Sequence, residues 1–281
     1  MLIAKTIKQA RKVIHEAKLK SKTIGFVPTM GALHKGHLSL VKKAKKDCDF
    51  VVVSIFVNPT QFGPKEDYRK YPRTFQNDKL LLEKENVDLV FCPSVKEMYP
   101  EDFSVYVTEE NLSRFLCGKS RPGHFRGVCT VVAKLLNIIT PDVAYFGQKD
   151  FQQAKIIEKM VKNLNLPLIV KLEPTIREND GLAMSSRNKY LSGSERQDAL
   201  AISQSLNLAK KLILKGERSC ENIKNDIKKH ICQKKSVKID YVEIVDAETL
   251  EPGVKLSSRV VIAIAVYLGK TRLIDNIVLK V

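Results

Sequence analysis

The chain has 281 residues, of which 44% are hydrophobic and 28% are charged, and its formal net charge is +17. This composition supplies enough apolar material for one large domain or two unequal ones, and it excludes a disordered or low-complexity protein. No apolar run approaches the ~20 residues of a membrane-spanning helix, and charges interrupt the N-terminal stretch where a secretory signal would be apolar. We therefore expect a cytoplasmic protein without a membrane partner.

The distribution of lysine and cysteine argues against a nucleic-acid-binding protein, a disulfide-rich protein and a zinc protein. Lysines occur throughout the chain, whereas a nucleic-acid binder more often concentrates them beside aromatic residues. This favours a basic surface around a pocket for anions, and we expect no nucleic-acid partner. The six cysteines are scattered and form no CxxC pair, so we expect free thiols in place of a disulfide framework or a zinc site.

Apolar residues at helical spacing over residues 6–20 predict a helix near the start of the chain. Short apolar runs then alternate with amphipathic stretches as far as residue 172. We expect strands at 23–27, 50–57, 87–92, 143–146 and 168–172, with helices between them at 36–46, 74–85, 128–139 and 150–164. This alternation predicts an α/β domain with a Rossmann-like, doubly wound parallel sheet, which binds ligands at the carboxyl ends of its strands.

The pattern changes near residue 190, where two long helical stretches precede three strand-like runs. We expect a smaller C-terminal α+β domain with helices at 194–215 and 221–230 and strands at 239–245, 260–266 and 271–281. The boundary falls between 175 and 190, which predicts a nucleotide-binding Rossmann-like domain over residues 1–180 and the α+β domain over residues 181–281.

Two histidines flank a lysine and a glycine where the first of these strands gives way to a helix. His34 and His37 are three residues apart, so they share one helix face and can donate hydrogen bonds to phosphate oxygens. A helix N-terminus adds N–H groups and a positive dipole end, and Gly31 and Gly36 let a phosphate chain lie close to the backbone. Surface histidines or a two-histidine metal site are the alternative, but the strand–helix junction favours phosphate binding.

Two further segments follow expected strands and so reach the same edge of the sheet. In the Gly-Gln-Lys-Asp segment at 147–150, Lys149 could neutralise an α-phosphate, and Asp150 could cap the next helix or contact a ribose. The Met-Ser-Ser-Arg segment at 184–187 offers two hydroxyls and the Arg187 guanidinium, which suit a flexible clamp on the β- and γ-phosphates. Alone it could be a plain solvated loop, and its pairing with the histidine turn favours the phosphate role.

Two glutamines and one basic segment have less specific patterns. Gln61 lies in the segment 58–73, which is long enough to act as a lid, and Gln153 falls one turn after Asp150. Their amides suit a substrate with hydroxyls and a carboxylate, although sequence reasoning alone favours surface amides. In the glycine- and cation-rich segment 117–127, Gly-Lys-Ser is not a P-loop ending, because the upstream glycine and the leading strand are missing. The alternative that this segment is a basic loop beside an acidic substrate or a nucleotide is retained.

Four motifs, in chain order and spread over the chain, resemble those of the pantothenate synthetase family. They are Pro-Thr-Met-Gly-Ala-Leu-His-Lys-Gly-His at 28–37, Asn-Pro-Thr-Gln-Phe at 58–62, Phe-Gly-Gln-Lys-Asp at 146–150 and Met-Ser-Ser-Arg-Asn at 184–188. The family belongs to the nucleotidylyl-transferase superfamily, which shares the HxGH turn and a distant version of the KMSKS loop. Here Ser-Ser-Arg stands where class I aminoacyl-tRNA synthetases place Lys-Ser-Lys.

The resemblance implies a two-step ligation. ATP and (R)-pantoate would give pantoyl-adenylate and pyrophosphate, and the amine of β-alanine would then attack the adenylate to give (R)-pantothenate and AMP. Mg²⁺ would accompany ATP, although no carboxylate cluster for a metal is visible in the sequence. Family members are commonly homodimers, so the resemblance also implies a homodimer.

The resemblance also implies the roles of individual residues. His37 would act as the acid near the leaving phosphate, His34 would share that contact, and Lys149 and Arg187 would contact the phosphates. Gln61 would bind pantoate and β-alanine, and Gln153 would bind pantoate. The residues that would contact ATP are Met30, Gly31, Ala32, Leu33, His34, Lys35, Gly36, His37, Gly147, Gln148, Lys149, Asp150, Ile176, Met184, Ser185, Ser186 and Arg187.

Two competing functions stay open at this point. A transferase that adenylates a phosphate ester would share the HxGH turn, but such chains are usually shorter and are not expected to carry the 58–62 motif. A tRNA- or nucleic-acid-binding protein related to the synthetases would bind with strong salt dependence. The chain is too short for a synthetase core together with an anticodon-binding domain, which favours the ligase.

Overall fold

The computed structural model describes residues 1–64, 66–256 and 258–281. The chain divides into two compact units, each built from several stretches of sequence. Unit 1 comprises Met1–Glu110, Arg121–Gly147 and Gln153–Pro174, and unit 2 comprises Asn111–Ser120, Gln148–Gln152 and Thr175–Val281. Two short stretches, 111–120 and 148–152, therefore pack with a unit whose main part lies much later in the chain.

A six-stranded, fully parallel sheet forms the centre of unit 1. The strand order is β1-β4-β3-β2-β5-β6. Five strands match apolar runs in the sequence, whereas β1 was missed because it has only three residues, two of them exposed. The strands are β1 (Leu2–Ala4), β2 (Ile24–Thr29), β3 (Phe50–Ile55), β4 (Leu89–Phe91), β5 (Val143–Gly147) and β6 (Ile169–Glu173).

The direction of winding reverses between β2 and β5. From β2 the chain steps outward to β3 and β4, whereas from β5 it steps outward to β6 on the other side. The two central strands are neighbours, with Gly25 paired to Val143 and Phe26 paired to Ala144. Open α/β sheets bind ligands beyond the carboxyl ends of such a strand pair. The histidine turn begins where β2 ends, and the 147–150 segment begins where β5 ends.

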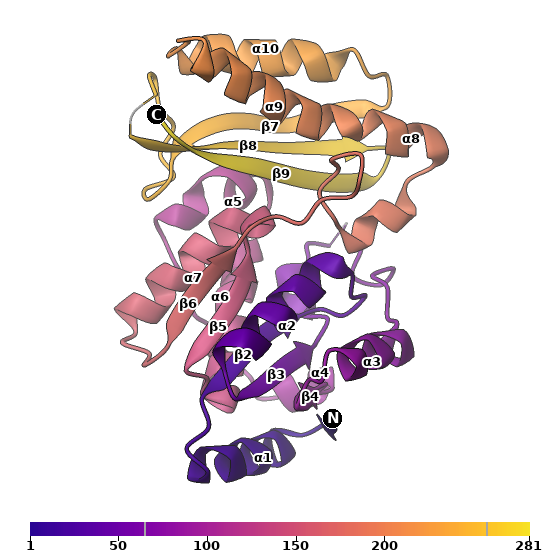
Figure 1. Ribbon diagram of the computed structural model, residues 1–281, viewed down its shortest axis with the longest axis vertical. Helices are drawn as coiled ribbons and strands as arrows, with labels where there is room; N and C mark the ends of the chain where they lie inside the picture. The colour runs from indigo at the N-terminus through magenta and orange to yellow at the C-terminus, as the bar shows by residue number, and fades with distance from the viewer. Residues whose placement is uncertain (65, 257) are drawn as a thin grey trace. The chain divides into compact units, whose positions relative to one another are not determined.

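Helices cover both faces of this sheet (Figure 1), so the expected doubly wound α/β fold is confirmed. On one face, Val41 of α2 and Leu82 of α3 pack with Val27, Val51 and Tyr145 in a buried cluster. The helices α1 and α6 contact one another, and they connect strands in the opposite direction along the sheet, which places them on the other face. The helices are α1 (Ile7–Leu19), α2 (Lys35–Asp47), α3 (Phe75–Lys84), α4 (Val95–Met98), α6 (His124–Ile139) and α7 (Phe151–Asn163).

Unit 2 is an α+β unit around a three-stranded antiparallel sheet in the order β7-β8-β9. Helices α9 and α10 lie along one face of this sheet (Figure 1), where Ile202 and Ile227 pack with Ile244 and Ile264 in the core. This confirms the expected smaller C-terminal α+β architecture. The elements are α5 (Leu116–Ser120), α8 (Gly193–Asp198), α9 (Leu200–Leu214), α10 (Cys220–Cys232), β7 (Val237–Asp246), β8 (Arg259–Leu268) and β9 (Thr271–Lys280).

Two local expectations were wrong. The helix expected at 194–215 is two helices that meet at Ala199, and neither proline nor glycine marks the interruption. The segment 117–127, expected as a loop, contributes to α5 and contains the first turn of α6, which begins at His124 and not at residue 128. The segment 58–73 contains the short 3₁₀ helix η1 (Pro59–Gln61).

Two sequence-based exclusions can be compared with the structure. All six cysteines lie in the described part of the chain and are free, as predicted. Among the described residues, none of the helices combines the length and the apolar character that a membrane crossing requires.

Candidate active site

His34 and His37 close the N-terminus of α2 with a reciprocal pair of hydrogen bonds. His34 is the N-cap residue, and its Nδ1 accepts a hydrogen bond from the N–H of Gly36 at 3.1 Å. Nδ1 of His37 accepts a hydrogen bond from the N–H of His34 at 3.3 Å. The two ring centroids are 4.1 Å apart. The structure thus brings the two histidines together at the start of the helix, where the sequence places them.

These hydrogen bonds determine which ring nitrogen carries the proton. A neutral imidazole has one donor nitrogen and one acceptor nitrogen. Because Nδ1 is the acceptor in both His34 and His37, Nε2 carries the proton of each neutral ring. Both rings therefore have an N–H donor at Nε2, beside a helix N-terminus that favours anions. Such donors can stabilise the negative charge that develops on a departing phosphate.

A buried carboxylate on α3 holds the turn between β2 and the histidines. The Asp78 side chain is fully buried. Its Oδ2 accepts a hydrogen bond from the N–H of Ala32 and its Oδ1 accepts one from the N–H of Leu33, both at 2.9 Å. The Thr74 hydroxyl donates to Oδ1 at 3.1 Å. A buried carboxylate without such donors would be strongly destabilising, so the turn and Asp78 depend on one another.

The backbone of this turn explains why it needs to be held. Gly31 has φ +79° and Ala32 has φ +50°, both in the left-handed region. A Cβ atom at Gly31 would lie 3.0 Å from Asp78 Oδ2 and 3.0 Å from Ile55 Cγ2, so a side chain there would displace both groups. A left-handed conformation costs a residue such as alanine roughly 1–2 kcal/mol. The hydrogen bonds to Asp78 offset that cost and keep the turn in the shape that starts α2 at His34.

The amide of Gln61 is oriented from two sides. Asn58 is buried, and its Nδ2 donates to Gln61 Oε1 at 3.0 Å. On the other side, Gln61 Nε2 lies 3.4 Å from the Met30 sulfur. The structure therefore brings two predicted site residues, Gln61 and Met30, into contact, and it places the 58–62 motif beside the turn that leads to the histidines. Asn58 was quoted in that motif but was not predicted to orient Gln61.

Arg121, just before α6, and His124, the first residue of α6, anchor the main chain of this loop. Arg121 makes a bidentate ion pair with Glu66, with Nε and Nη2 each 2.6 Å from a carboxylate oxygen. The Gln61 carbonyl accepts hydrogen bonds from Arg121 Nη2 at 3.2 Å and from His124 Nδ1 at 2.8 Å. Although burial opposes ionisation of Glu66, the hydrogen bonds from Arg121 hold the pKa of that carboxyl below its usual value. A cation in the 117–127 segment therefore holds the Gln61 loop.

Gly127 allows the same loop to approach α6 closely. A Cβ atom at this position would lie 2.6 Å from the Gln61 nitrogen and closer still to the Thr60 carbonyl oxygen. The Gly127 carbonyl accepts a hydrogen bond from Asn58 Nδ2 at 3.1 Å. Because real Cβ atoms do not approach backbone so closely, only glycine permits this packing. Glycine and cations in this segment thus serve the geometry of unit 1.

In unit 2, the segment that follows β5 is held by its backbone carbonyls. Gln148, Lys149 and Asp150 form the 3₁₀ turn η3 (Gln148–Asp150), which directly precedes α7. Asn276 Nδ2 donates to the Gln148 carbonyl at 2.9 Å and to the Lys149 carbonyl at 3.0 Å. Asp150 is exposed. The main chain that carries Lys149 is therefore held in a short and defined turn.

The remaining unit 2 candidates lie on an antiparallel turn that spans 176–184. The N–H of Met184 donates to the Ile176 carbonyl at 3.0 Å, so the structure brings these two predicted residues together. Arg177 and Ala183 form an antiparallel bridge next to them. Arg177 Nη1 donates to the Gly181 carbonyl at 3.0 Å, across the turn. The segment is therefore a hydrogen-bonded hairpin and not a loop without internal structure.

The candidates that follow the hairpin begin a short helix. Ser185 is its N-cap, and its hydroxyl accepts a hydrogen bond from the N–H of Arg187 at 3.2 Å. Ser186 is buried, and Arg187 is half-buried. Gln153 lies in unit 1 on α7 and is half-buried, and among the described residues no hydrogen bond joins it to another candidate.

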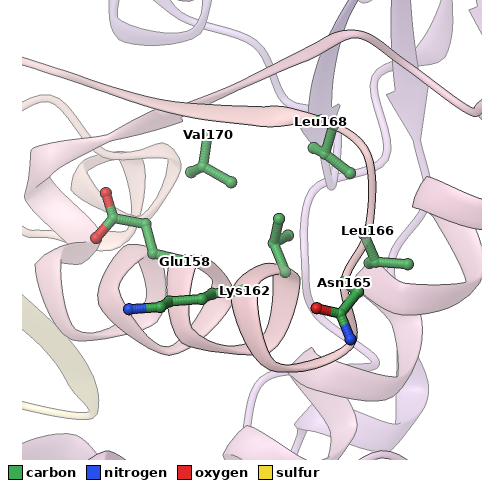
Figure 2. Close-up of a pocket in the computed structure, with 7 residues that line it drawn as sticks. Glu158, Lys162, Asn165, Leu166, Leu168 and Val170 are labelled. Carbon is green, nitrogen blue, oxygen red and sulfur yellow. The ribbon is translucent and has the colours of Figure 1, made fainter.

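A separate pocket of about 430 Å³ lies on unit 1 between the end of α7 and the start of β6. Glu158 and Lys162 of the helix, and Leu168 and Val170 at the start of the strand, line it (Figure 2). In a parallel sheet, the amino end of β6 lies at the edge opposite the carboxyl end of β2, which His34 follows. The pocket is therefore distinct from the histidine turn.

Comparison with known protein families decides the class of the protein. The family model described as "Pantoate-beta-alanine ligase" matches residues 2–278. The chain belongs to this family. The resemblance that the four sequence motifs carry is confirmed, and the protein is a ligase of the pantoate–β-alanine class.

Curated and solved pantoate–β-alanine ligases match the chain over its whole length. The pantothenate synthetase of Thermotoga petrophila is 60% identical over 279 residues, which cover 99% of this chain and 100% of the relative. That of Caldicellulosiruptor saccharolyticus is 56% identical over 281 residues and covers 100% of both. The crystal structure of the Thermus thermophilus pantothenate synthetase has a TM-score of 0.93 and 42% identity, with 99% of each chain covered.

One solved ligase was described with ligands. The pantoate–β-alanine ligase of Francisella tularensis has a TM-score of 0.81 and 40% identity, with 99% of this chain and 97% of that chain covered. Its structure is described as a complex with β-γ ATP and β-alanine.

Several residues that hold the candidate segments within each unit were missed by sequence reasoning. They act through hydrogen bonds to groups far away in the sequence, which are backbone groups for all but Asp275 and the Arg177 guanidinium for Asp275, and no motif around them indicates such a role. The only local signal was the glycine- and cation-rich composition of 117–127. The residues are Asp78, Arg121, His124, Asp275 and Asn276.

Proposed function

We propose that this ligase joins (R)-pantoate and β-alanine through a pantoyl-adenylate intermediate formed from ATP. The observation that carries the proposal is the histidine pair at the start of α2, where both rings have Nδ1 engaged by backbone N–H groups and the proton at Nε2. The β-γ ATP and β-alanine named for the Francisella relative support these two substrates. Pantoate is the acid that the family name implies.

In the first step, a pantoate carboxylate oxygen attacks the α-phosphorus of ATP. A carboxylate–phosphorus bond forms, the bond between the α-phosphorus and the bridging oxygen breaks, and pyrophosphate leaves with the bonding electrons. We assign His37 as the group that donates from Nε2 to the leaving phosphate, with His34 beside it. Lys149 and Arg187 are assigned to neutralise charge on the phosphates. These residues stabilise charge and position the reactants, which is the main contribution that proteins make to such transfers.

In the second step, the neutral amine of β-alanine attacks the acyl carbon of the adenylate. The carbon–nitrogen bond forms, AMP departs with the electrons of the acyl carbon–oxygen bond, and the nitrogen loses a proton to give the amide. We assign Gln61 to bind pantoate and the incoming β-alanine, and Gln153 to bind pantoate. The contacts of Gln61 with Asn58 and Met30 support this role, because they fix the direction of its amide.

The ATP-contacting residues are proposed as the resemblance implies them. They are the turn residues 30–37, the residues 147–150 after β5, Ile176, and the residues 184–187 after the hairpin. In unit 1, the turn held by Asp78 supports the assignment. In unit 2, the hydrogen bond between Met184 and Ile176 supports it, because it makes one rigid hairpin of two assigned positions.

Mg²⁺ is proposed to enter with ATP. Within residues 1–64, 66–256 and 258–281, no group of three or more His, Cys, Asp or Glu side chains is arranged to hold a metal ion. The buried carboxylate nearest to the turn, Asp78, has both oxygens occupied by N–H donors. Mg²⁺ commonly binds to substrate phosphates and water with few protein ligands. The residues present therefore fit a nucleotide-borne ion, which would neutralise phosphate charge.

Three further properties are proposed as the sequence pattern and the resemblance predict them. The ligase is expected to act in the cytoplasm and to form homodimers. We also propose a functional division of the chain into a nucleotide-binding domain over residues 1–180 and an α+β domain over residues 181–281.

Exchange of labelled pyrophosphate into ATP tests the proposed function. With pantoate present and β-alanine absent, exchange that requires pantoate is expected, because the first step is reversible. If exchange requires a different acid, the adenylation mechanism holds and that acid replaces pantoate as the substrate. No exchange with any acid, from folded protein that binds ATP, would overturn carboxylate activation and favour a phosphate-ester transferase.

A further inference from the structure

Two consecutive polar residues of β9 are buried in unit 2. Asp275 is 3% exposed and Asn276 is 4% exposed. The strand lies at the edge of the β7-β8-β9 sheet, and neighbouring side chains of a strand point to opposite faces. Asp275 lies on the same face of the sheet as Leu273 and Ile277, which pack in the core under α9 and α10. Asn276 therefore points to the opposite face. Buried polar groups in such positions require partners.

The partner of Asp275 is the hairpin that carries the assigned adenine and phosphate residues. Arg177 Nη1 lies 2.6 Å from Asp275 Oδ2, and Arg177 Nη2 lies 3.0 Å from Oδ1. The same guanidinium donates to the Gly181 carbonyl at 3.0 Å. A bidentate pair of this kind fixes both the position and the plane of the guanidinium. Asp275 thereby attaches the hairpin between Ile176 and Met184 to β9.

The partner of Asn276 is the other nucleotide-binding segment of unit 2. Its Nδ2 donates to the carbonyls of both Gln148 and Lys149, at 2.9 and 3.0 Å. The two anchors are also joined to one another, because the N–H of Asn276 donates to Asp275 Oδ1 at 2.8 Å. One strand residue on each face of the sheet edge therefore holds one of the two segments.

We propose that Asp275 and Asn276 are positioning residues for ATP, which set the spacing between the Gln148–Lys149 turn and the 176–187 hairpin. The proposal rests on the ATP-binding roles of these segments in the proposed function. Neither residue needs to touch the nucleotide. A site held in its bound geometry before ligand arrives avoids the cost of ordering flexible segments on binding, so loss of the anchor weakens ATP binding.

A second ion pair in the same sheet provides a matched control. Arg272 of β9 contacts Asp240 of β7 through Nε at 3.0 Å and Nη2 at 2.8 Å. Asp240 also accepts a hydrogen bond from the Ser120 hydroxyl at 3.1 Å. This pair joins the same edge strand to its surroundings, and its partners Ser120 and Cys117 are not candidate ATP residues. A variant that lacks this pair therefore shows how much stability the protein loses when an ion pair is removed from this sheet.

The experiment measures the dissociation constant for ATP by calorimetry, with the melting temperature of each variant, in full-length protein. Asp275→Asn and Asn276→Ala are expected to weaken ATP binding at least tenfold. Arg177→Lys is expected to weaken ATP binding less, because lysine keeps the positive charge beside Asp275 and loses only the two-point contact. Asp240→Asn is expected to lower the melting temperature but to leave the ATP dissociation constant within twofold of wild type. If Asp275→Asn does not fold, Asn276→Ala and Arg177→Lys carry the same test.

ATP binding within twofold of wild type in the folded anchor variants would overturn the proposal, and so would an equal loss of affinity in Asp240→Asn. Calorimetry with ATP does not depend on the acid that is activated. A wild-type protein that binds ATP without pantoate-dependent exchange would overturn the proposed function. The comparison of the anchor variants with the control variant would still decide the positioning role. A wild-type protein that does not bind ATP would overturn both.

Discussion

Nδ1 of His37 accepts the backbone N–H of His34, so the side chain assigned to the chemistry also caps the helix that carries it. The two tasks use different ring nitrogens, since the cap occupies Nδ1 and the proton sits on Nε2. Capping therefore holds the donor that the proposed reaction uses in a fixed orientation.

Replacement of His37 separates these two tasks. His37→Ala is expected to lower pantoate-dependent pyrophosphate exchange by about 10²–10⁴-fold, the typical contribution of a proton donor, and to lower stability by only about 1 kcal/mol, the usual value of a lost cap. His37→Asn keeps a side-chain acceptor for the His34 N–H and is expected to recover stability without activity. Exchange rates and urea unfolding measure the two effects. Full activity, or an unfolded His37→Ala protein, would contradict the assignment.

Replacement of Asp78 tests whether the turn is held by a carboxylate. In Asp78→Asn, the amide nitrogen would face an N–H of Ala32 or Leu33, so one buried donor loses its acceptor at a cost of about 1–3 kcal/mol. We expect at least tenfold weaker ATP binding, because the turn that positions His34 changes shape. Calorimetry and thermal unfolding measure both quantities.

Asp88→Asn is the control for this prediction. Asp88 also accepts a backbone N–H, that of Val51 at 2.8 Å, and pairs with Lys45 at 3.0 Å, but it directly precedes β4 and contacts the amino end of β3. This variant is expected to lose stability and keep its ATP affinity. An Asp78→Asn protein with wild-type affinity would show that the turn holds its shape without the carboxylate.

Replacement of Gly127 tests the approach of the Gln61 loop to α6. The new methyl group in Gly127→Ala would overlap the main chain of Thr60 and Gln61, so the loop has to move. We expect a higher KM for pantoate with a smaller change in ATP affinity, because Gln61 lies on the displaced loop whereas Asp78 separately holds the backbone of the histidine turn. Gly193→Ala is the control, since a Cβ atom there meets nothing within 4 Å. Steady-state kinetics with each substrate varied in turn decides, and an unchanged KM for pantoate would refute the role of the loop.

The acid stability of unit 1 depends on Asp47. Hydrogen bonds from Lys171 at 2.6 Å and Lys43 at 3.1 Å lower the pKa of this carboxyl from 3.8 to about 2. A lowered pKa in the folded state means that the stabilisation is present above pH 4 and is lost as the pH falls towards 2. Urea unfolding of wild type and Asp47→Asn is expected to show a stability difference at pH 6 that vanishes near pH 2. A difference that is independent of pH would contradict this account.

The parallel sheet and the histidine turn could be predicted because their signals are local. Strands such as β3 are uninterrupted apolar runs, and the histidines mark a strand–helix junction within four residues. The contacts that hold the candidate segments within each unit are not local. Asp78 binds backbone groups 45 and 46 residues away, Arg121 binds a carboxylate 55 residues away, and Asn276 binds carbonyls 127 and 128 residues away. No periodicity or motif indicates such pairings, and only the folded chain reveals them.

Unit 2 combines segments that are far apart in the sequence, so its parts leave the ribosome at different times. The Lys149 carbonyl receives its hydrogen bond from Asn276, which the ribosome adds 127 residues later. At typical elongation rates of about 5–20 residues per second, roughly 6 to 25 s separate the two residues. All six strands of the parallel sheet are already translated by Glu173 and can assemble in that interval. A nascent chain that stalls before β9 would therefore have the strands of the parallel sheet while its 148–149 segment still lacks the Asn276 anchor.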